Sequence, residues 1–384
     1  MKKYIKAKKI VLENEVLEEA YLEIRDEKFG QVVMEKPVEG EVIDYSDWIL
    51  SPGLVDTHIH GFHSHDVMDN DVEGLKEISK GLLSCGVTSW LATTFTDTTE
   101  NLNEVCKTIG DHYQEMPGAK IRGIFLEGPF FTEKHKGAQN PNYMSNPNKE
   151  KLDRWHKLSH DLVNKIALAP EREGVEDFIK FATKKGVYTA LGHSDASFEQ
   201  AKAAVDAGAN IFVHTYNGMS GLHHRNPGMV GAALTLEDVY AEIITDGHHV
   251  HPAAIDVVLK ARGKDETVFV TDCMGAGGIG EGMSKLGEFD VEVKDGQARL
   301  VSDGSLAGSV LELIQGVQNV VEWKLASLEE ALQMASLTPA KSVGIDHLCG
   351  KISSGFDADF ILVDEKGNLQ ATYLNGEKVY EREI

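Results

Sequence analysis

Eight short apolar runs, separated mostly by helix-like segments, occupy residues 54 to about 340 and constrain the fold more than any other feature. Short apolar runs that alternate with segments of 3.6-residue period predict parallel strands joined by crossover helices. Eight such units are the number that closes a (β/α)8 TIM barrel, so we predict an α/β protein built on this barrel. The runs end near His60, Thr93, Glu127, Pro170, His193, His214, Asp246 and Asp272.

The two ends of the chain differ from this pattern, because they carry strand-like pieces without helical segments between them. We expect both ends to pair into one small β-sandwich domain beside the barrel. The domains are then residues 1–52 and 344–384 for the small β domain and 53–343 for the barrel. Residues 290–301 are expected to form a hairpin that turns at Asp295 and Gly296.

Composition excludes several classes of partner. The chain has 384 residues and a formal net charge of −23, which argues against binding to nucleic acid or to an anionic membrane. No apolar run reaches the ~18 to 20 residues that span a bilayer, and the first residues lack the apolar length of a signal peptide. Four scattered cysteines do not suggest a disulfide framework. We therefore expect a cytoplasmic protein with reduced thiols.

The sequence around His58 and His60 predicts a metal site. Residues i and i+2 of a strand face the same side, so both imidazoles can bind one ion. The C-terminal ends of barrel strands share one face of the molecule, where active sites are built. Imidazole nitrogen together with carboxylate oxygen suits zinc or iron(II) better than calcium or magnesium. Four further candidate ligands end other runs: Glu127, His193, His214 and Asp272.

Each candidate ligand also has an ordinary structural interpretation. A single histidine on a strand is usually a satisfied core or surface residue, Glu127 can cap a turn, and Asp272 can cap a helix. In the functional interpretation Glu127 bridges two ions, since a carboxylate has two oxygens. Asp272 then accepts a proton as general base and returns it to a leaving group as general acid. The recurrence of such residues at the ends of five runs favours the metal site.

The motifs that contain these residues resemble the N-acetylglucosamine-6-phosphate deacetylase family of the amidohydrolase superfamily. The resemblance covers essentially the whole chain. It rests on PGLVDTHIHG (52–61), LEGPF (126–130), KGAQNP (136–141), GHSDA (192–196), HTYNGM (214–219), DGHHVHP (246–252), TDCM (271–274) and LAGS (306–309). The fourth run has no lysine at the place where other superfamily members carry a bridging carboxylated lysine, which argues against hydantoinase-like enzymes.

The resemblance implies hydrolysis of the acetamide of N-acetyl-D-glucosamine 6-phosphate to D-glucosamine 6-phosphate and acetate, in amino sugar salvage. It implies one or two divalent ions per subunit, with zinc or iron expected. One ion would bind His58, His60 and Asp272. The other would bind His193 and His214, with Glu127 between the two ions and Asp272 shuttling the proton.

The resemblance also implies a set of substrate-binding residues. His249 and Arg225 would hold the phosphate, with Arg225 reaching from the second subunit of a homodimer, and a bidentate arginine fits phosphate geometry. Gln139 stands where many family members have histidine, and it can donate a hydrogen bond but is never cationic. The remaining members of the implied set are Asn217, Gly218, Leu306, Ala307 and Gly308.

Two other functions stay open at this point. An N-acetylgalactosamine-6-phosphate deacetylase would act on a substrate that differs at one hydroxyl. A non-catalytic sugar phosphate sensor on the same fold would be expected to lack Asp272 or a metal ligand, and the sequence retains all of them.

Overall fold

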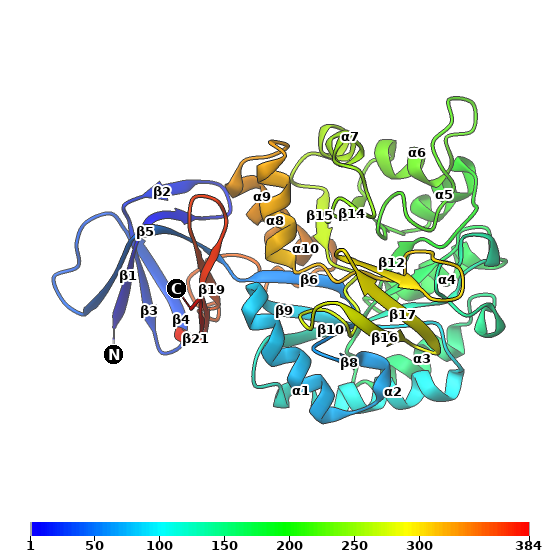
Figure 1. The fold of residues 1–384 in the computed structure, drawn as a ribbon, viewed down its shortest axis with the longest axis horizontal. Coiled ribbons are helices and arrows are strands. Elements are labelled where there is room, and N and C mark those ends of the chain that lie inside the picture. Colours follow the sequence, from blue (N-terminus) through cyan, green and yellow to red (C-terminus); the bar gives the residue numbers. More distant parts are fainter. Residues whose placement is uncertain (1, 384) are drawn as a thin grey trace.

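The computed structural model describes residues 2–383, in which a barrel and a separate β-sheet lie side by side (Figure 1). Eight strands form the barrel in the order β15-β14-β13-β12-β11-β10-β9-β6, and all neighbouring strands are parallel. A parallel bridge between Ile59 and Cys273 joins the two ends of this order and closes the ring. The predicted TIM barrel is confirmed. Its strands are β6 (Leu54–Ile59), β9 (Val87–Thr94), β10 (Lys120–Phe130), β11 (Val163–Leu168), β12 (Tyr188–Leu191), β13 (Ile211–Phe212), β14 (Tyr240–Ile244) and β15 (Thr267–Val270).

Helices surround the barrel, and most of them bury one face, whereas α6 and α10 are buried over almost their whole length. In α4 the buried residues Val175, Phe178, Ile179 and Ala182 follow the i, i+3, i+4, i+7 spacing of an amphipathic helix. Phe178 meets Phe130 of β10 edge to face, at 5.2 Å between ring centroids. The helices are α1 (Val72–Gly81), α2 (Thr99–His112), α3 (Lys149–Leu158), α4 (Val175–Lys184), α5 (Phe198–Asp206), α6 (Gly228–Thr235), α7 (Pro252–Arg262), α8 (Leu313–Glu322), α9 (Leu328–Met334) and α10 (Leu337–Ser342). Short 3-10 turns are η1 (Val67–Asp69), η2 (Leu82–Cys85), η3 (Tyr113–Glu115), η4 (Glu133–His135) and η5 (Pro141–Tyr143).

The two ends of the chain pair with each other beside the barrel, as the sequence predicts, and the strands of the expected sandwich all belong to one hydrogen-bonded sheet. The sheet has the order β21-β20-β19-β5-β1-β3-β4, with β2 paired to β1, and β5 joins β19 of the C-terminal segment in antiparallel register. It packs around its own apolar core, which includes Leu50 and Phe360. The hydrogen bonds run without a break through the whole sheet. Its strands are β1 (Lys3–Val11), β2 (Val16–Glu18), β3 (Tyr21–Arg25), β4 (Lys28–Val33), β5 (Glu41–Pro52), β19 (Phe360–Val363), β20 (Leu369–Leu374) and β21 (Glu377–Glu381).

A small antiparallel sheet follows the last barrel strand and covers one side of the barrel mouth (Figure 1). The predicted hairpin is confirmed as β17 (Phe289–Lys294) and β18 (Gln297–Leu300). The structure adds a third strand, β16 (Gly282–Leu286), which the sequence analysis missed. A two-stranded ribbon, β7 (Gly61–Phe62) and β8 (His65–Asp66), follows β6. No helix within residues 2–383 has the length and apolar character needed to cross a membrane.

Lys120, at the start of β10, connects the barrel to the small β-sheet. Its Nζ lies 2.9 Å from Asp357 Oδ2, 2.7 Å from Asp359 Oδ2 and 2.7 Å from Asn375 Oδ1. We expect Lys120→Met to lower the free energy of unfolding by about 1–3 kcal/mol, because two partly buried carboxylates lose a shared donor. Urea unfolding measures this change. The exposed pair Lys107–Asp111 supplies the control, and Lys107→Met should leave the free energy of unfolding essentially unchanged, because water and salt screen an exposed ion pair. Equal changes in the free energy of unfolding of the two variants would contradict the prediction.

Candidate metal centre and active site

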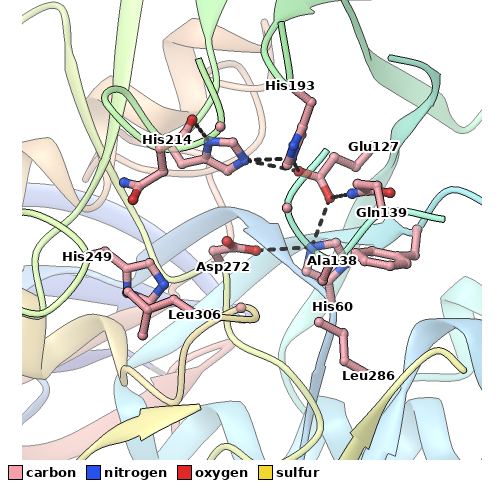
Figure 2. Close-up of a pocket in the computed structure, with 15 residues that line it drawn as sticks. His60, Glu127, Ala138, Gln139, His193, His214, His249, Asp272, Leu286 and Leu306 are labelled. Carbon is pink, nitrogen blue, oxygen red and sulfur yellow. Dashed lines mark hydrogen bonds and ion pairs between the residues drawn. The ribbon is translucent and has the colours of Figure 1, made fainter. Parts of the chain in front are cut away.

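A cavity of about 130 Å³ lies at the C-terminal ends of the barrel strands (Figure 2). Of the fourteen residues that the sequence analysis proposes for the site, eleven line this cavity: His60, Glu127, Gln139, His193, His214, Asn217, Gly218, His249, Asp272, Leu306 and Gly308. His58 is fully buried and contacts Glu127 and Asp272. Ala307 is buried between two lining residues. Arg225 is the exception and is exposed at the surface.

Glu127 lies at the centre of four imidazoles. Its Oε1 is 3.2 Å from Nε2 of both His193 and His214 and 3.4 Å from Nε2 of His58. Its Oε2 is 3.3 Å from Nε2 of His60. Burial raises the pKa of this carboxyl, but the surrounding imidazoles outweigh burial and hold it well below its ordinary value. Glu127 is therefore an anion placed between two pairs of histidines.

Asp272 completes the cluster from the loop after β15. Its Oδ1 lies 3.1 Å from Nε2 of His60 and 3.4 Å from Nε2 of His58 (the His60 contact is drawn in Figure 2). The pKa of Asp272 is lowered, because the nearby imidazoles outweigh its burial. Asp272, His193 and His214 all have positive φ, at 51°, 44° and 30°. Residues with a Cβ rarely adopt this conformation, and it concentrates at functional sites.

The donor set fits a divalent metal centre. Ligand atoms lie within 4.8 Å of one another in three groups of residues: His58, His214 and Asp272; His58, His60 and Glu127; and Glu127, His193 and His214. His58 Nε2 is buried and has no hydrogen-bond partner within residues 2–383, although two carboxylates face it. Burial lowers the pKa of His58, but Asp272 and Glu127 outweigh it and raise the pKa to about 9. Neighbouring nitrogen and carboxylate donors of this kind are the ligands of zinc and iron sites.

Main-chain carbonyls fix the orientation of two of the imidazoles. His193 Nδ1 lies 2.9 Å from the carbonyl of His135, and His214 Nδ1 lies 3.1 Å from the carbonyl of Asn217. Both rings therefore direct Nε2 toward Glu127. Such contacts behind a ligand are what hold metal-binding histidines in place.

Gln139 contacts Glu127 directly. Its Nε2 donates to Glu127 Oε2 at 2.7 Å, and its Oε1 accepts from the main-chain N–H of Thr96 at 2.9 Å (the first contact is drawn in Figure 2). The amide is held at both ends, so its NH₂ group faces the centre of the site. The sequence analysis proposed Gln139 as a site residue from the resemblance but did not predict this contact.

His249 lies across Asp272 from Gln139 in Figure 2, beside Leu306. Its Nδ1 is 2.6 Å from Asp246 Oδ2, and Asp246 also accepts from the main-chain N–H of His248 and His249, both at 2.8 Å. Burial lowers the pKa of His249, but the contact with Asp246 outweighs burial and raises it. This end of the cavity therefore offers a cationic imidazole to an anionic group.

The structure places three apolar residues in the wall that the sequence analysis missed: Phe95, Ala138 and Leu286. Phe95 meets His60 edge to face at 5.6 Å between ring centroids. It follows β9 directly, so its position at the end of a barrel strand was an available signal. Leu286 ends β16, and only the folding of that strand over the barrel mouth brings it to the cavity.

Comparison with known proteins places this chain in a family. A profile of the amidohydrolase family matches residues 49–379, and the chain belongs to that family. It is 42% identical to an N-acetylglucosamine-6-phosphate deacetylase of Vibrio furnissii over 333 residues, which cover 86% of this chain and 83% of that protein. It is 37% identical to an N-acetylgalactosamine-6-phosphate deacetylase of Escherichia coli O157:H7 over 374 residues, covering 97% of this chain and 98% of that one.

A solved structure agrees with these relatives. A mutant N-acetyl-D-glucosamine-6-phosphate deacetylase from Mycobacterium smegmatis, in complex with N-acetyl-D-glucosamine-6-phosphate, superposes with a TM-score of 0.93. The two chains share 27% identity, and the match covers 98% of this chain and 99% of that one. The resemblance read from the motifs is confirmed.

Proposed function

We propose that this protein hydrolyses the acetamide of N-acetyl-D-glucosamine 6-phosphate to D-glucosamine 6-phosphate and acetate, in amino sugar salvage. The observation that carries the proposal is Glu127 between two pairs of histidines, with Asp272 beside it in the same cavity. The substrate class follows the relatives, which are deacetylases of N-acetylated amino sugar phosphates.

The metal centre in this proposal holds one or two divalent ions, zinc or iron. His58, His60 and Asp272 would bind one ion and His193 and His214 the other, with Glu127 bridging. When bound, such ions supply a Lewis acid that polarises a carbonyl and lowers the pKa of water.

Asp272 is the general base and then the general acid of the proposed reaction. Its lowered pKa keeps the carboxylate ionised, so it can accept a proton from the attacking water. It then returns this proton to the amine nitrogen as the bond from nitrogen to the acetyl carbon breaks. Gln139 keeps Glu127 in place and presents its second N–H to the cavity.

The phosphate and sugar are proposed to lie at the opposite end of the cavity. His249 contacts the phosphate, and the cavity wall there is completed by Asn217, Gly218, Leu306, Ala307 and Gly308. Within residues 2–383, no lysine or arginine lines the cavity, although a phosphate dianion is best held by such a group. Arg225 lies on an exposed segment before α6. We propose a homodimer in which Arg225 reaches the phosphate of the neighbouring subunit.

His249 provides a test of the phosphate assignment. We expect His249→Asn to raise KM for the phosphorylated sugar about 10- to 100-fold, because a charge-assisted hydrogen bond is lost. Asp246 and Asp272 are the charged groups that act on this imidazole, and they keep it cationic above its ordinary pKa. The wild-type KM should therefore rise only as the pH passes this raised pKa, while the variant shows no such rise. Steady-state kinetics against pH measures both effects.

The matched control for this test is His248→Asn, which changes an exposed neighbour and should leave KM unchanged. The unphosphorylated sugar gives a second control, since its weak turnover should not depend on His249. Equal losses with both sugars would show that His249 does not act through the phosphate.

The first experiment measures acetate release from N-acetylglucosamine 6-phosphate, its galacto epimer and the unphosphorylated sugar, with and without added divalent metal. Preference for the phosphorylated gluco substrate, lost on chelation, supports the proposal. Preference for the galacto epimer would instead assign the activity of the Escherichia coli relative, which covers nearly the whole chain. No release from any of the three by metal-loaded protein would leave a sugar phosphate sensor, although all six candidate metal ligands are present.

We also propose a division into two domains and a cytoplasmic location. Residues 1–52 and 344–384 would form the small β domain, and 53–343 the barrel. The end of β5 at Pro52 and of α10 at Ser342 supports these boundaries. The four cysteines are buried free thiols, which suits a reducing compartment.

A further inference from the structure

Lys165 and Glu242 form an ion pair inside the barrel, and both residues are fully buried. Lys165 belongs to β11 and Glu242 to β14, and β12 and β13 lie between these strands in the sheet. The pair therefore crosses the barrel interior. Lys165 Nζ contacts Glu242 Oε1, and it also lies 3.4 Å from the carbonyl of Thr57 and 3.8 Å from the centre of the Phe125 ring.

The second oxygen of Glu242 contacts the candidate metal centre from behind. Glu242 Oε2 lies 3.2 Å from Nδ1 of His58. An ionised carboxylate accepts hydrogen bonds only, so Nδ1 must be the ring nitrogen that carries the hydrogen. When the ring is neutral, as a metal ligand must be, Nε2 then keeps its lone pair and faces the cluster, where it has no hydrogen-bond partner among residues 2–383.

This support differs from that of the other three histidines of the centre. His193 and His214 donate from Nδ1 to main-chain carbonyls, and Nδ1 of His60 has no partner among the described residues. Among these four imidazoles, His58 alone has a carboxylate behind it. A carboxylate behind a histidine fixes the ring and makes its other nitrogen a stronger metal donor.

Folding alone does not account for a buried lysine and glutamate. Both charges lose their hydration, and replacing such a pair with apolar residues is often neutral or stabilising. Here each oxygen of Glu242 has one donor, Lys165 on one side and His58 on the other. Lys165 compensates the charge of Glu242 and holds it in place, so the carboxylate remains fixed behind His58.

We infer that Lys165 and Glu242 are positioning residues that orient His58 and set the metal affinity of the His58/His60 half of the centre. The inference rests on the metal centre proposed above. Neither residue touches the cavity, so their effect on the reaction would act through His58.

Two double variants separate orientation of His58 from simple support of the fold. Lys165→Met with Glu242→Gln removes both charges but keeps an oxygen that can accept from His58. Lys165→Met with Glu242→Leu removes both charges and the acceptor. Neither variant leaves an uncompensated buried charge, so they differ mainly in the hydrogen bond to His58.

Zinc binding, measured by competition with a chelating dye, is the readout, and His58→Asn identifies the zinc that depends on His58. For the variant Lys165→Met with Glu242→Gln, we expect an affinity for this zinc within a few-fold of the wild-type affinity. The variant Lys165→Met with Glu242→Leu should bind this zinc about 10- to 100-fold more weakly. Its zinc affinity at the His193/His214 half of the centre should change little. Thermal unfolding of the metal-free proteins reports separately on support of the fold.

Equal, wild-type-like zinc affinity in the two double variants would overturn the inference and leave the pair a structural one. If no zinc bound to wild-type protein depends on His58, the His58/His60 half of the proposed metal centre fails and the inference fails with it. If the variant Lys165→Met with Glu242→Leu does not fold, the ¹⁵N spectrum of the histidines in zinc-loaded wild-type protein decides. A His58 signal with the hydrogen on Nδ1 supports the inference, and a hydrogen on Nε2 overturns it.

Discussion

Replacing Asp272 with asparagine is expected to reduce turnover about 10³- to 10⁴-fold, while the phosphorylated sugar still binds. The amide has the size of the carboxylate but cannot accept the proton of the attacking water or return it to the leaving amine. Asp272 Oδ1 is 3.1 Å from Nε2 of His60, so the substitution also tests its role as a ligand. Acetate release gives turnover, calorimetry with the sugar phosphate gives binding, and elemental analysis gives the metal content.

The three readings together distinguish the two roles of Asp272. If turnover is lost while metal and sugar still bind, the role of Asp272 is proton transfer. If the metal is lost as well, the main role of Asp272 is that of a metal ligand. Glu171→Gln is the control, because this carboxylate lies beside the site but only accepts from Thr132, Ser194 and Asp195, at 2.6 to 2.8 Å. Turnover of Asp272→Asn within about 10-fold of wild type would exclude the role of general base.

Glu127→Gln is expected to remove most of the bound metal and to lower turnover by at least about 10⁴-fold, since the reaction depends on the Lewis acid. Glu127 faces Nε2 of all four histidines at 3.2 to 3.4 Å. The amide removes the anion and turns an N–H group toward nitrogens that must remain free for metal. Metal content after dialysis, together with acetate release, measures the effect.

Glu288→Gln is the matched control for this prediction. Glu288 accepts from Asn140 at 2.8 Å and from Tyr143 at 3.4 Å on an exposed surface, and it does not line the cavity. It should keep the full metal content and turnover. A Glu127→Gln protein that retains its metal would show that the carboxylate is not a shared ligand.

Local patterns in the sequence predicted the barrel and the six candidate metal ligands, whereas the proposed substrate-binding residues came from the resemblance to a family. The apolar runs and the helical period mark the β/α units, and the two-residue period of a strand places His58 and His60 on one side. Parallel strands of a barrel all present their C-terminal ends to one face. Polar residues at the ends of different runs, such as Glu127, His193 and His214, could therefore be predicted to meet.

Only the tertiary structure decided which residues support the site from a distance. Lys165 and Glu242 lie inside apolar runs, and their contact depends on how the sheet closes across its interior. Leu286 reaches the cavity because β16 folds over the barrel mouth, and Arg225 stays outside because its segment is exposed. The two-residue period of a strand determines which side a residue faces. Contacts between residues of distant segments, such as Lys165 and Glu242, depend instead on how the whole chain packs. The sequence by itself therefore determined the fold and the residues at the strand ends, and tertiary packing decided what surrounds them.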